Sequence, residues 1–438
     1  MPAALPQSLW AATAAAGPAL APLERALRVD VAIIGAGYTG LSAALQLAAA
    51  GRSVAVLEAR SLGERASGLN GGQVIAGLKT DPDALEALFG AEHGARLVAS
   101  VAGAPDLVFD LIARHVIDCD ARRSGWIQPA TSAAALAQLA TRAAQWQRRG
   151  AAVELLPARA VAALTGSERY CGGLLDRRGG TVQPLAYLRG LARAVLRHHG
   201  GIFAQCPVLH LRRAAREWQL ETPRAIVTAP AVIAATNAYS GGLIGALQRS
   251  IVTVPSFQVA TVPLTPAQRA GILPGGQAAS DTWHLLRYFR LDGSGRLVLG
   301  ARGTFGAVPG PRSCRHHYRA VHEIYPQLGD VRFEYHWGGL VAMTRDHLPH
   351  LHELAPGLLA GLGYNGRGVA MATLMGRLLA QRTLGMSDAE LAFPVTPLRP
   401  IPFHRGARFA ARAAIQYLRA VDLVTRGRDR LRGRASWT

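Results

Sequence analysis

The chain is nearly devoid of lysine: Lys79 is its only lysine, although the formal net charge is +20. Almost all of the positive charge is therefore arginine, a bias that reflects genomic base composition in part. For this reason the basicity does not predict a nucleic-acid partner, although a general attraction to anionic surfaces follows from it.

Cysteines and long apolar runs are also scarce. The four cysteines, Cys119, Cys171, Cys206 and Cys314, are widely separated and form no CxxC pair, so neither a zinc site nor a disulfide framework is predicted. This usage favours a reducing compartment. The sequence contains no apolar run of about 18 residues or more, so no transmembrane helix is expected. Residues 1–22 lack the basic segment of a signal peptide, so we expect a cytoplasmic protein.

The remaining composition is typical of a globular protein with a large core. Hydrophobic residues make up 50% of the chain and charged residues 17%, which excludes an intrinsically disordered protein. With 438 residues, the chain is long enough for two domains.

The most informative motif lies in residues 30–40. The apolar run 31–34 predicts a buried strand, and Gly35, Gly37 and Gly40 follow it with the spacing of a dinucleotide-binding turn. These glycines permit a tight turn, close approach of a pyrophosphate to the backbone, and close packing of the next helix on the sheet. The helix start offers free N–H groups and a positive dipole end to the anion.

A second predicted strand, residues 52–58, ends in an acidic residue. Glu58 stands roughly 20 residues past the glycines, where a carboxylate binds ribose hydroxyls in dinucleotide-binding units. An ordinary βαβ unit without a ligand is the alternative interpretation.

The pattern along the rest of the chain predicts an α/β fold: a discontinuous Rossmann-like domain with an inserted, antiparallel β-rich domain. Helical spacing is found over 81–118, 131–149, 184–199 and 312–325, and β-rich segments over 202–204, 216–235, 251–263 and 283–301. Residues 358–385 return to a strand, a glycine turn and a helix.

Three further stretches complete a family pattern. They are 66–73 after Glu58, 234–240 at the end of a later strand, and a segment that runs from Trp337-Gly338-Gly339 through 346–349 to 363–369. In this combination and order the chain resembles the D-amino-acid-oxidase-like FAD-dependent oxidoreductases, in particular their γ-glutamylputrescine oxidoreductase branch. The resemblance runs from about Trp10 to the C-terminal helix.

The resemblance implies FAD and divides the chain into domains. The expected FAD-binding domain comprises 28–80, 184–245 and 337–400, and the expected substrate domain is mainly 81–183 and 246–336. Residues 401–438 are expected to form a basic C-terminal helix and tail.

The resemblance also implies which residues hold FAD. Small residues at 66–73 let backbone amides approach the pyrophosphate and the flavin edge, and the helix that begins near Val369 directs its positive end at the flavin N1–C2=O edge. Plain glycine loops are the alternative interpretation. The expected set is Gly35, Gly37, Tyr38, Thr39, Gly40, Glu58, Ala59, Arg60, Ala66, Ser67, Gly68, Asn70, Gly71, Gly72, Gln73, Val208, Thr236, Asn237, Gly338, Gly363, Tyr364, Asn365, Gly366, Arg367, Gly368 and Val369.

Two departures from the family pattern affect this prediction. Arg367 stands where family members often carry His, and its guanidinium is expected to reinforce the same positive field. Some relatives attach FAD through a cysteine near the segment 337–346, but this chain has none there, so we expect FAD to be bound non-covalently.

Enzymes of this family oxidise CH–NH or CH–NH2 groups: hydride passes to flavin N5, and the imine is then hydrolysed to an aldehyde and ammonia. Dioxygen or another electron acceptor reoxidises the flavin.

Amino-acid-oxidising relatives bind the substrate carboxylate with the arginine of a Gly-Leu-Arg-Pro-type stretch. This chain has Gly339-Leu340-Val341 there, and Val341 cannot bind a carboxylate.

The substrate we expect is therefore a small amine resembling γ-glutamylputrescine, as in polyamine catabolism. An oxidase or dehydrogenase of amino acids or N-methyl-amino acids, such as glycine, sarcosine or D-amino acids, is the alternative. A further alternative is a non-enzymatic protein that binds flavin at a membrane surface.

Candidate catalytic residues are Lys79, Trp283, Tyr288 and Arg290. Lys79 follows the flavin loop, and its charge would stabilise superoxide; a solvated surface lysine is the alternative. The other three lie in the inserted β domain and are candidates to line the substrate site. The alternative is that they serve only in ordinary packing of the sheet. His347, His350 and His352 do not have the spacing of a helical metal pair, and no metal is expected.

The C-terminal segment predicts a basic amphipathic helix. One face carries arginines within an arc of roughly 60°, and the opposite face is apolar. The arginines are Arg405, Arg408, Arg412, Arg419 and Arg426, with Arg428, Arg430, Arg432 and Arg434 after them; the apolar residues are Ala407, Ala410, Ala414, Leu418 and Val421. The helix either docks on its own domain or contacts an anionic membrane through 403–434, at the inner face of the membrane. No nucleic-acid role is expected.

Overall fold

The computed structural model describes residues 5–435, without the side chains of Arg405, Arg408, Leu423 and 425–435. The chain divides into two compact units. Unit 1 contains residues up to Ala121, Val182–Thr253 and Gly339–Pro402; unit 2 contains Arg122–Thr181, Val254–Gly338 and the residues from Phe403 onward. These bounds differ from the expected domains chiefly because 81–121 belongs to unit 1 and the C-terminal helix to unit 2.

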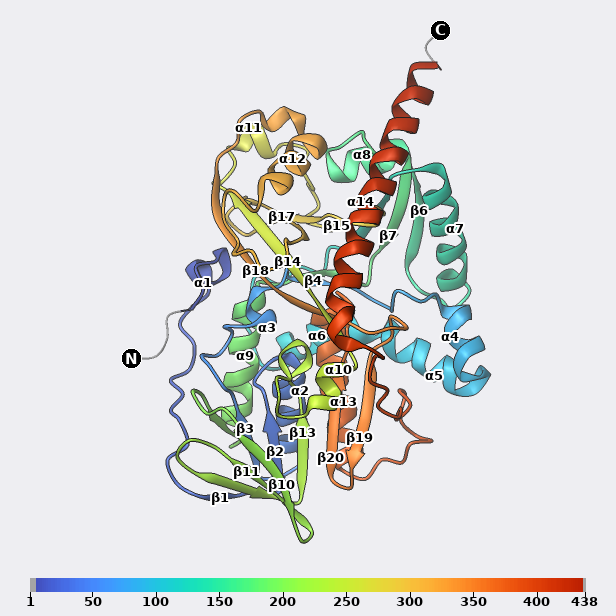
Figure 1. The fold of residues 1–438 in the computed structure, drawn as a ribbon. Coiled ribbons are helices and arrows are strands. Elements are labelled where there is room, and N and C mark those ends of the chain that lie inside the picture. Colours follow the sequence, from blue (N-terminus) through green and yellow to red (C-terminus); the bar gives the residue numbers. More distant parts are fainter. Residues whose placement is uncertain (1–4, 436–438) are drawn as a thin grey trace. The chain divides into compact units, whose positions relative to one another are not determined.

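Unit 1 is built on a six-stranded sheet in the order β19-β20-β13-β2-β3-β9 (Figure 1). All strands run parallel except β19, which pairs antiparallel with β20. The central strands are continuously buried, as expected for a parallel sheet covered on both faces. The bounds are β2 Val31–Ile34, β3 Val54–Leu57, β9 Gly201–Phe203, β13 Ala231–Ala234, β19 His350–Ala355 and β20 Leu358–Leu362.

A smaller sheet completes the strands of unit 1. Its four strands lie in the order β1-β12-β11-β10, and the short β4 is separate from it. The bounds are β1 Leu27–Arg28, β4 Gln73–Val74, β10 His210–Ala214, β11 Glu217–Glu221 and β12 Ile226–Ala229.

Helices α2 and α13 pack against each other beside the parallel sheet. Their close approach requires Gly376, because a Cβ there would lie 2.4 Å from the Thr39 carbonyl oxygen. Ser42 Oγ also donates to the Thr373 carbonyl oxygen at 2.7 Å. The helices of unit 1 are α1 Leu9–Thr13, α2 Tyr38–Ala49, α3 Ala66–Leu69, α4 Pro82–Phe89, α5 Ala91–Ala102, α6 Ala104–Arg114, α9 Pro184–Arg197, η1 Asn237–Tyr239, α10 Gly245–Arg249 and α13 Gly368–Thr383.

Unit 2 is built on an eight-stranded sheet in the order β18-β14-β17-β16-β15-β5-β7-β6 (Figure 1). Neighbours from β14 to β15 and from β5 to β6 pair antiparallel, and β15 runs parallel to β5. The bounds are β5 Trp126–Ala130, β6 Val153–Pro157, β7 Gly172–Asp176, β8 Gly180–Thr181, β14 Val252–Thr261, β15 Ala278–Ser280, β16 Tyr288–Leu291, β17 Leu297–Arg302 and β18 Phe333–Met343.

The two faces of this sheet differ in polarity. Phe257, Phe289 and Leu299 point into an apolar core that the helix α12 completes with Val321 and Ile324. Because side chains alternate along a strand, the neighbours of these residues face the other way. The helices of unit 2 are α7 Ala133–Gln147, α8 Ala158–Thr165, α11 Pro266–Arg269, α12 Arg315–Ile324, η2 Pro326–Leu328 and α14 His404–Ala435.

The C-terminal helix α14 docks on unit 2 through an acidic residue. The Asp422 carboxylate, 5% exposed, accepts hydrogen bonds from the backbone N–H groups of His284 and Leu285 at 3.3 and 3.1 Å. It also lies 2.8 Å from His284 Nδ1, and Arg412 stacks over the Phe305 ring at 5.3 Å. In the described part of the chain, no helix combines the length and apolarity needed to span a membrane.

Candidate active site

The motifs predicted to carry the function meet at one edge of the unit 1 sheet. Parallel strands end at a common edge, and β2, β3, β13 and β20 are all parallel. The glycine turn follows β2, Glu58 follows β3, 235–240 follows β13 and 363–368 follows β20. This edge therefore collects residues that are far apart in the sequence.

The glycine turn adopts the conformation that its sequence requires. Gly35 has a φ of +102°, which favours glycine, and its N–H donates to the Leu57 carbonyl at 2.8 Å. A Cβ at Gly40 would lie 1.9 Å from the Gly35 carbonyl oxygen, so only glycine lets α2 begin this close to the turn.

The start of α2 leaves donors free. Across the described residues 5–435, the N–H groups of Gly37, Thr39 and Gly40 donate no hydrogen bond to another part of the chain. A Cβ at Gly37 would lie 3.0 Å from Ser67 Oγ, and the absence of this atom keeps the backbone accessible. These donors and the helix dipole suit a bound anion such as a pyrophosphate.

Glu58, which follows β3, joins the end of that strand to the glycine turn. Its Oε2 accepts from the Ala36 N–H at 2.8 Å and its Oε1 accepts from the Arg60 N–H at 3.0 Å. Burial raises the pKa of this carboxyl, while the two backbone donors oppose the shift. Arg60 itself forms an ion pair with Glu64, and Ala59 is exposed.

The segment 66–73 is held against the glycine turn. Ser67 Oγ accepts from the Tyr38 N–H at 3.2 Å. Asn70 closes the segment on itself, because its Nδ2 donates to the Ser67 carbonyl and its Oδ1 accepts from the Gly72 N–H. A Cβ at Gly68 would lie 2.0 Å from the Gly63 carbonyl oxygen. Ala66, Gly71 and Gln73 belong to the same segment.

Two of the residues expected to contact FAD use their side chains inside the protein. The Tyr38 hydroxyl donates to the Pro184 carbonyl at 2.9 Å, and the Tyr38 ring packs on Tyr187 at 5.2 Å between centroids. Thr39 Oγ1 lies 2.5 Å from the Tyr364 hydroxyl, so these two predicted residues do meet. The backbone N–H of Thr39 is therefore open to a ligand, whereas that of Tyr38 already donates to Ser67 Oγ.

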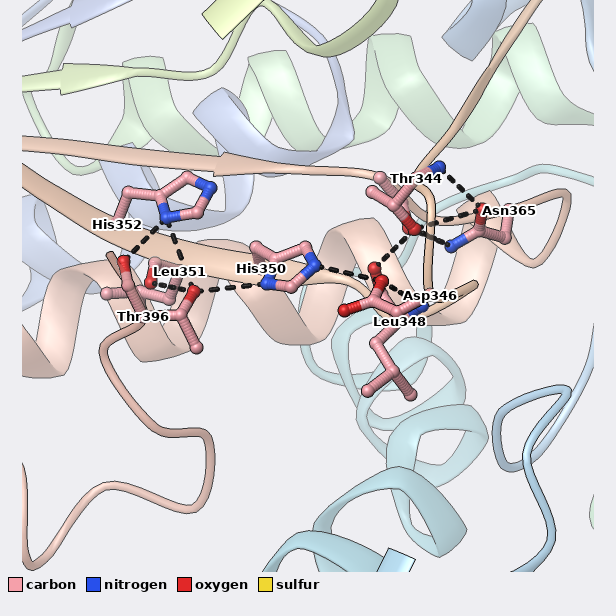
Figure 2. Close-up of polar contacts among 9 residues, drawn as sticks. Thr344, Asp346, Leu348, His350, Leu351, His352, Asn365 and Thr396 are labelled. Atoms are coloured by element: carbon pink, nitrogen blue, oxygen red, sulfur yellow. Dashed lines mark hydrogen bonds and ion pairs between the residues drawn. The ribbon is translucent and has the colours of Figure 1, made fainter. Parts of the chain in front are cut away.

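The turn after β20 is fixed by amide side chains. The Gly363 N–H donates to Asn237 Oδ1 at 3.0 Å, which joins the predicted segments 234–240 and 363–369. Asn365, with a φ of +51°, is buried, and its Oδ1 accepts from the Thr344 N–H at 3.0 Å (Figure 2). Its Nδ2 donates to the Gly363 carbonyl oxygen. Thr236 Oγ1 lies 2.8 Å from Ser240 Oγ.

The helix α13 begins immediately after this turn, with Arg367 at its N-cap. A Cβ at Gly366 or Gly368 would meet no described atom within 4 Å, so the backbone is open to close approach. The Arg367 guanidinium donates to the carbonyl oxygens of Ala76 and Gly77. Its role in this structure is thus to hold the chain that precedes Lys79, in addition to any effect of its charge.

The histidines of the β19 region form an internal network. His350 lies between Asp346 Oδ1 at 3.1 Å and Thr396 Oγ1 at 3.0 Å, and His352 Nδ1 lies 2.7 Å from the Thr396 carbonyl oxygen (Figure 2). Burial lowers the pKa of His352 to about 4. Among the described residues, no group of three or more acidic, His or Cys side chains could hold a metal ion.

The remaining predicted residues are placed elsewhere. Lys79 is half-buried in unit 1, and Val208 packs beside the core of the smaller sheet. Gly338 lies on β18 in unit 2, where a Cβ would be 2.5 Å from the Phe257 ring. Trp283 is buried and follows Asp281, which accepts from its N–H at 3.4 Å.

Tyr288 and Arg290 lie on β16 of unit 2. The Tyr288 hydroxyl is 2.9 Å from Ser256 Oγ, and Arg290 is 1% exposed, with its Nε donating to the Leu291 carbonyl.

Sequence reasoning missed Tyr239, whose hydroxyl oxygen accepts from the Leu340 N–H at 3.1 Å, and Thr344, the partner of Asn365. Both stood inside the quoted motifs, but nothing in the sequence distinguished them.

The residues at this edge fit FAD. The free amides at α2 suit its pyrophosphate, the carboxylate of Glu58 suits ribose hydroxyls, and the open turn at Gly366 and Gly368 admits a flat ring close to a helix start.

Comparisons with known proteins agree with this geometry. The family model described as DAO, FAD dependent oxidoreductase, matches residues 30–382. The chain is 32% identical to γ-glutamylputrescine oxidoreductase of Escherichia coli (strain K12), over 90% of this chain and 93% of that protein. It is 31% identical to a probable oxidoreductase of Haemophilus influenzae, over 92% of this chain and 94% of that protein.

Solved structures support the fold. Glycine oxidase from Geobacillus kaustophilus superposes with a TM-score of 0.71 at 22% identity, and the match covers 84% of this chain and 99% of that chain. L-proline dehydrogenase from P. horikoshii gives a TM-score of 0.70 at 17% identity, covering 87% and 99%. The predicted α/β fold class, FAD cofactor and family are thereby confirmed. The chain belongs to the FAD-dependent oxidoreductase family and is an enzyme of that family's chemistry, the flavin-dependent oxidation of carbon–nitrogen bonds.

Proposed function

We propose that this enzyme oxidises the terminal C–N bond of a small acylated amine, with γ-glutamylputrescine as the model substrate. The observation that carries the proposal is Val341, which stands where amino-acid-oxidising relatives have their carboxylate-binding arginine. The 32% identity to a γ-glutamylputrescine oxidoreductase over 90% of the chain supports the same substrate class.

The backbone around Val341 is well fixed. The Leu340 N–H donates to the Tyr239 hydroxyl at 3.1 Å, and a Cβ at Gly339 would lie 3.6 Å from Ala66 Cα. Gly339, which belongs to unit 1, thus lies against the segment 66–73, which we propose holds the flavin. An apolar side chain at position 341 favours the methylene chain of an amine over a charged group.

We propose that FAD binds non-covalently at the carboxyl edge of the unit 1 sheet and supplies the hydride acceptor. In this proposal Gly37, Thr39 and Gly40 bind the pyrophosphate through their N–H groups, and Glu58 binds the ribose. Acid precipitation of the purified protein should release the yellow chromophore into the supernatant. Colour that stays with the pellet would show a covalent bond.

Anaerobic reduction of the flavin by a substrate panel tests the function. We expect γ-glutamylputrescine to bleach the flavin faster than glycine, sarcosine or D-alanine. Because the amine must lose its proton before hydride leaves, the rate should rise with pH across the titration of the bound amine. Fastest reduction by an amino acid would replace this proposal with its alternative, an amino-acid oxidase or dehydrogenase.

We also propose that α14 contacts an anionic membrane from the inner face. Asp422 and Arg412 hold one part of the helix on unit 2, while the exposed Phe409, Tyr417 and Arg419 lie on other sides. Vesicles containing phosphatidylglycerol should sediment the protein at low salt, whereas pure phosphatidylcholine vesicles should not. Equal sedimentation with both, or with neither, would contradict this proposal.

A further inference from the structure

The short N-terminal helix α1 lies against the segment that we propose holds FAD. It packs on α3, which is the first half of that segment, and on α9 (Figure 1). All three helices belong to unit 1. Leu9 and Trp10 of α1 are buried, with 0% and 1% of their surface exposed. A helix of five residues has little stability of its own, so its position depends on such contacts.

The indole of Trp10 is the contact that reaches the segment. Its Nε1 donates a hydrogen bond to the Asn70 carbonyl oxygen at 2.8 Å. Asn70 also fixes the segment through its side chain, because its Oδ1 accepts from the Gly72 N–H at 2.8 Å and its Nδ2 donates to the Ser67 carbonyl at 2.9 Å. The same Nδ2 donates to the Tyr38 hydroxyl at 3.1 Å. Trp10 therefore holds the residue that connects this segment to the start of α2.

The backbone of α1 is itself fixed by the start of α9. Gln183, the N-cap of α9, donates through Nε2 to the Trp10 carbonyl at 2.9 Å and to Thr13 Oγ1 at 3.1 Å. The residue before it, Val182, donates its N–H to the Gly72 carbonyl at 2.8 Å. Two consecutive residues thus hold α1 and the segment 66–73 to the same point of the scaffold.

The chain that follows α1 is held by two arginines of α9. Arg189 donates to the carbonyl oxygens of Ala14 and Ala15, and Arg193 donates to the Ala16 carbonyl oxygen. These bonds fix the path of the backbone and do not involve the segment 66–73. Helix α9 is therefore a fixed base for α1.

The segment 66–73 needs such support because of its composition. Three of its eight residues are glycine, namely Gly68, Gly71 and Gly72, and Gly72 has a φ of +67°. Glycine loses more conformational freedom on ordering than any other residue. A ligand that binds only the ordered conformation is weakened by the fraction of molecules in which that conformation is absent. A hydrogen bond that holds Asn70 in place raises the ordered fraction before the ligand binds.

We propose that residues 8–16 form a clasp on the segment 66–73 and that Trp10 is the positioning residue of this clasp. By fixing the Asn70 carbonyl, the indole N–H keeps the segment in the conformation that binds FAD. Trp10 acts through Asn70 and not on the reacting atoms. The inference rests on the FAD site proposed above, and it is independent of which amine is oxidised.

The test compares two buried tryptophans of unit 1. Trp10→Phe keeps an aromatic ring and removes the N–H that holds Asn70. Trp218→Phe is the matched control, because Trp218 lies on β11 and its Nε1 donates to the backbone carbonyl of Pro356 at 3.2 Å. Serial dilution of the FAD-loaded enzymes, with released FAD measured by its fluorescence, gives the Kd of each.

We expect the Kd for FAD to rise roughly 2- to 12-fold in Trp10→Phe, the range for loss of one neutral hydrogen bond. Trp218→Phe should keep the Kd of the wild type. An unchanged Kd in Trp10→Phe, or equal weakening in both variants, overturns the clasp.

Hydrogen exchange of the FAD-loaded enzymes gives a readout that a general loss of stability would not reproduce. In Trp10→Phe, peptides covering 66–73 should exchange faster than in the wild type, including the Gly72 N–H that Asn70 accepts. Peptides from β11 and β12 should keep their rates. Trp218→Phe should show the reverse pattern. Faster exchange in both regions of Trp10→Phe would show a general loss of stability and overturn the positioning role.

Thr13→Val tests the clasp even if Trp10→Phe does not fold. Thr13 is exposed, and valine removes only its hydroxyl, which accepts from Gln183 and donates to the Leu9 carbonyl. The loss should loosen α1 and raise the exchange of the segment 66–73. Wild-type exchange of this segment in Thr13→Val overturns the clasp.

Failure of the clasp can be distinguished from failure of the proposals on which it stands. These measurements use FAD and no substrate, so fastest flavin reduction by an amino acid would overturn the proposed amine substrate alone. If Glu58→Gln weakens FAD and Trp10→Phe does not, the proposed FAD site stands and the clasp is overturned.

Discussion

Replacing Glu58 by Gln is the sharpest test of the proposed FAD site. The carboxylate accepts the N–H groups of Ala36 at 2.8 Å and Arg60 at 3.0 Å, and the proposal adds the ribose hydroxyls of FAD. Gln has a single acceptor oxygen, so one of these donors would face an NH2 group. Loss of a charge-assisted hydrogen bond costs about 1.5–3 kcal/mol. At about 1.4 kcal/mol per tenfold change, the Kd for FAD should rise roughly 10- to 150-fold.

The measurement is a fluorescence titration of the apoprotein with FAD, with Glu64→Gln as the control. Glu64 pairs with Arg60 at 3.1 Å, so this variant removes a neighbouring charge without touching the turn. Its FAD affinity should match the wild type. The reasoning fails if Glu58→Gln binds FAD as tightly as the wild type, or if Glu64→Gln is weakened as much.

The pH dependence gives the same experiment a second readout. Burial raises the pKa of Glu58 in the folded apoprotein, so protonation begins at a higher pH than in an exposed carboxyl. Because FAD is proposed to bind the ionised form, the affinity of the wild type should fall as the pH falls through this raised pKa. Gln does not titrate, and the affinity of Glu58→Gln should therefore change less over the same range.

Three further predictions concern the scaffold. Gly376→Ala should destabilise the protein by about 1–3 kcal/mol, because the new Cβ would lie 2.4 Å from the Thr39 carbonyl oxygen. Thermal unfolding measures this loss of stability, and Gly406→Ala, where a Cβ would meet no described atom within 4 Å, is the control. His352 has its pKa lowered to about 4 by burial, so the unfolded state binds an extra proton between about pH 6.5 and 4. The Tm should then fall as the pH falls through this window, and His352→Asn should reduce the fall; an unchanged slope would assign the acid sensitivity to other groups. Asp422→Ala removes the acceptor of the His284 and Leu285 N–H groups and should make α14 more accessible to limited proteolysis, with the FAD content unchanged.

The meeting of these motifs at one sheet edge could be predicted because it depends on strand ends. Each motif follows an apolar run, and parallel strands bring their carboxyl ends to one edge. The spacing between Gly35 and Glu58 therefore predicted their meeting. The segment 363–369 joined them because it follows β20, another parallel strand of the same sheet.

Side-chain directions could not be predicted in the same way. Tyr38 stands inside the turn motif, yet its ring packs on Tyr187 of α9, a residue far along the chain. Arg367 stands next to the expected flavin edge, yet its guanidinium holds the carbonyl oxygens of Ala76 and Gly77. In both residues the tertiary partner determines the direction, and no local pattern encodes that partner.

The C-terminal helix illustrates how a sequence pattern can be correct and still leave the docked side undetermined. The arginine spacing predicted a basic face, and the exposed Arg412 and Arg419 are consistent with it, while Arg405, Arg408 and the arginines from Arg426 onward lie outside the described side chains. The docking contacts come from Asp422, an acidic residue that accepts from two backbone N–H groups, and from Arg412, which stacks over the Phe305 ring. Neither contact pairs a described arginine of the helix with a carboxylate, so docking and attraction to an anionic surface are compatible.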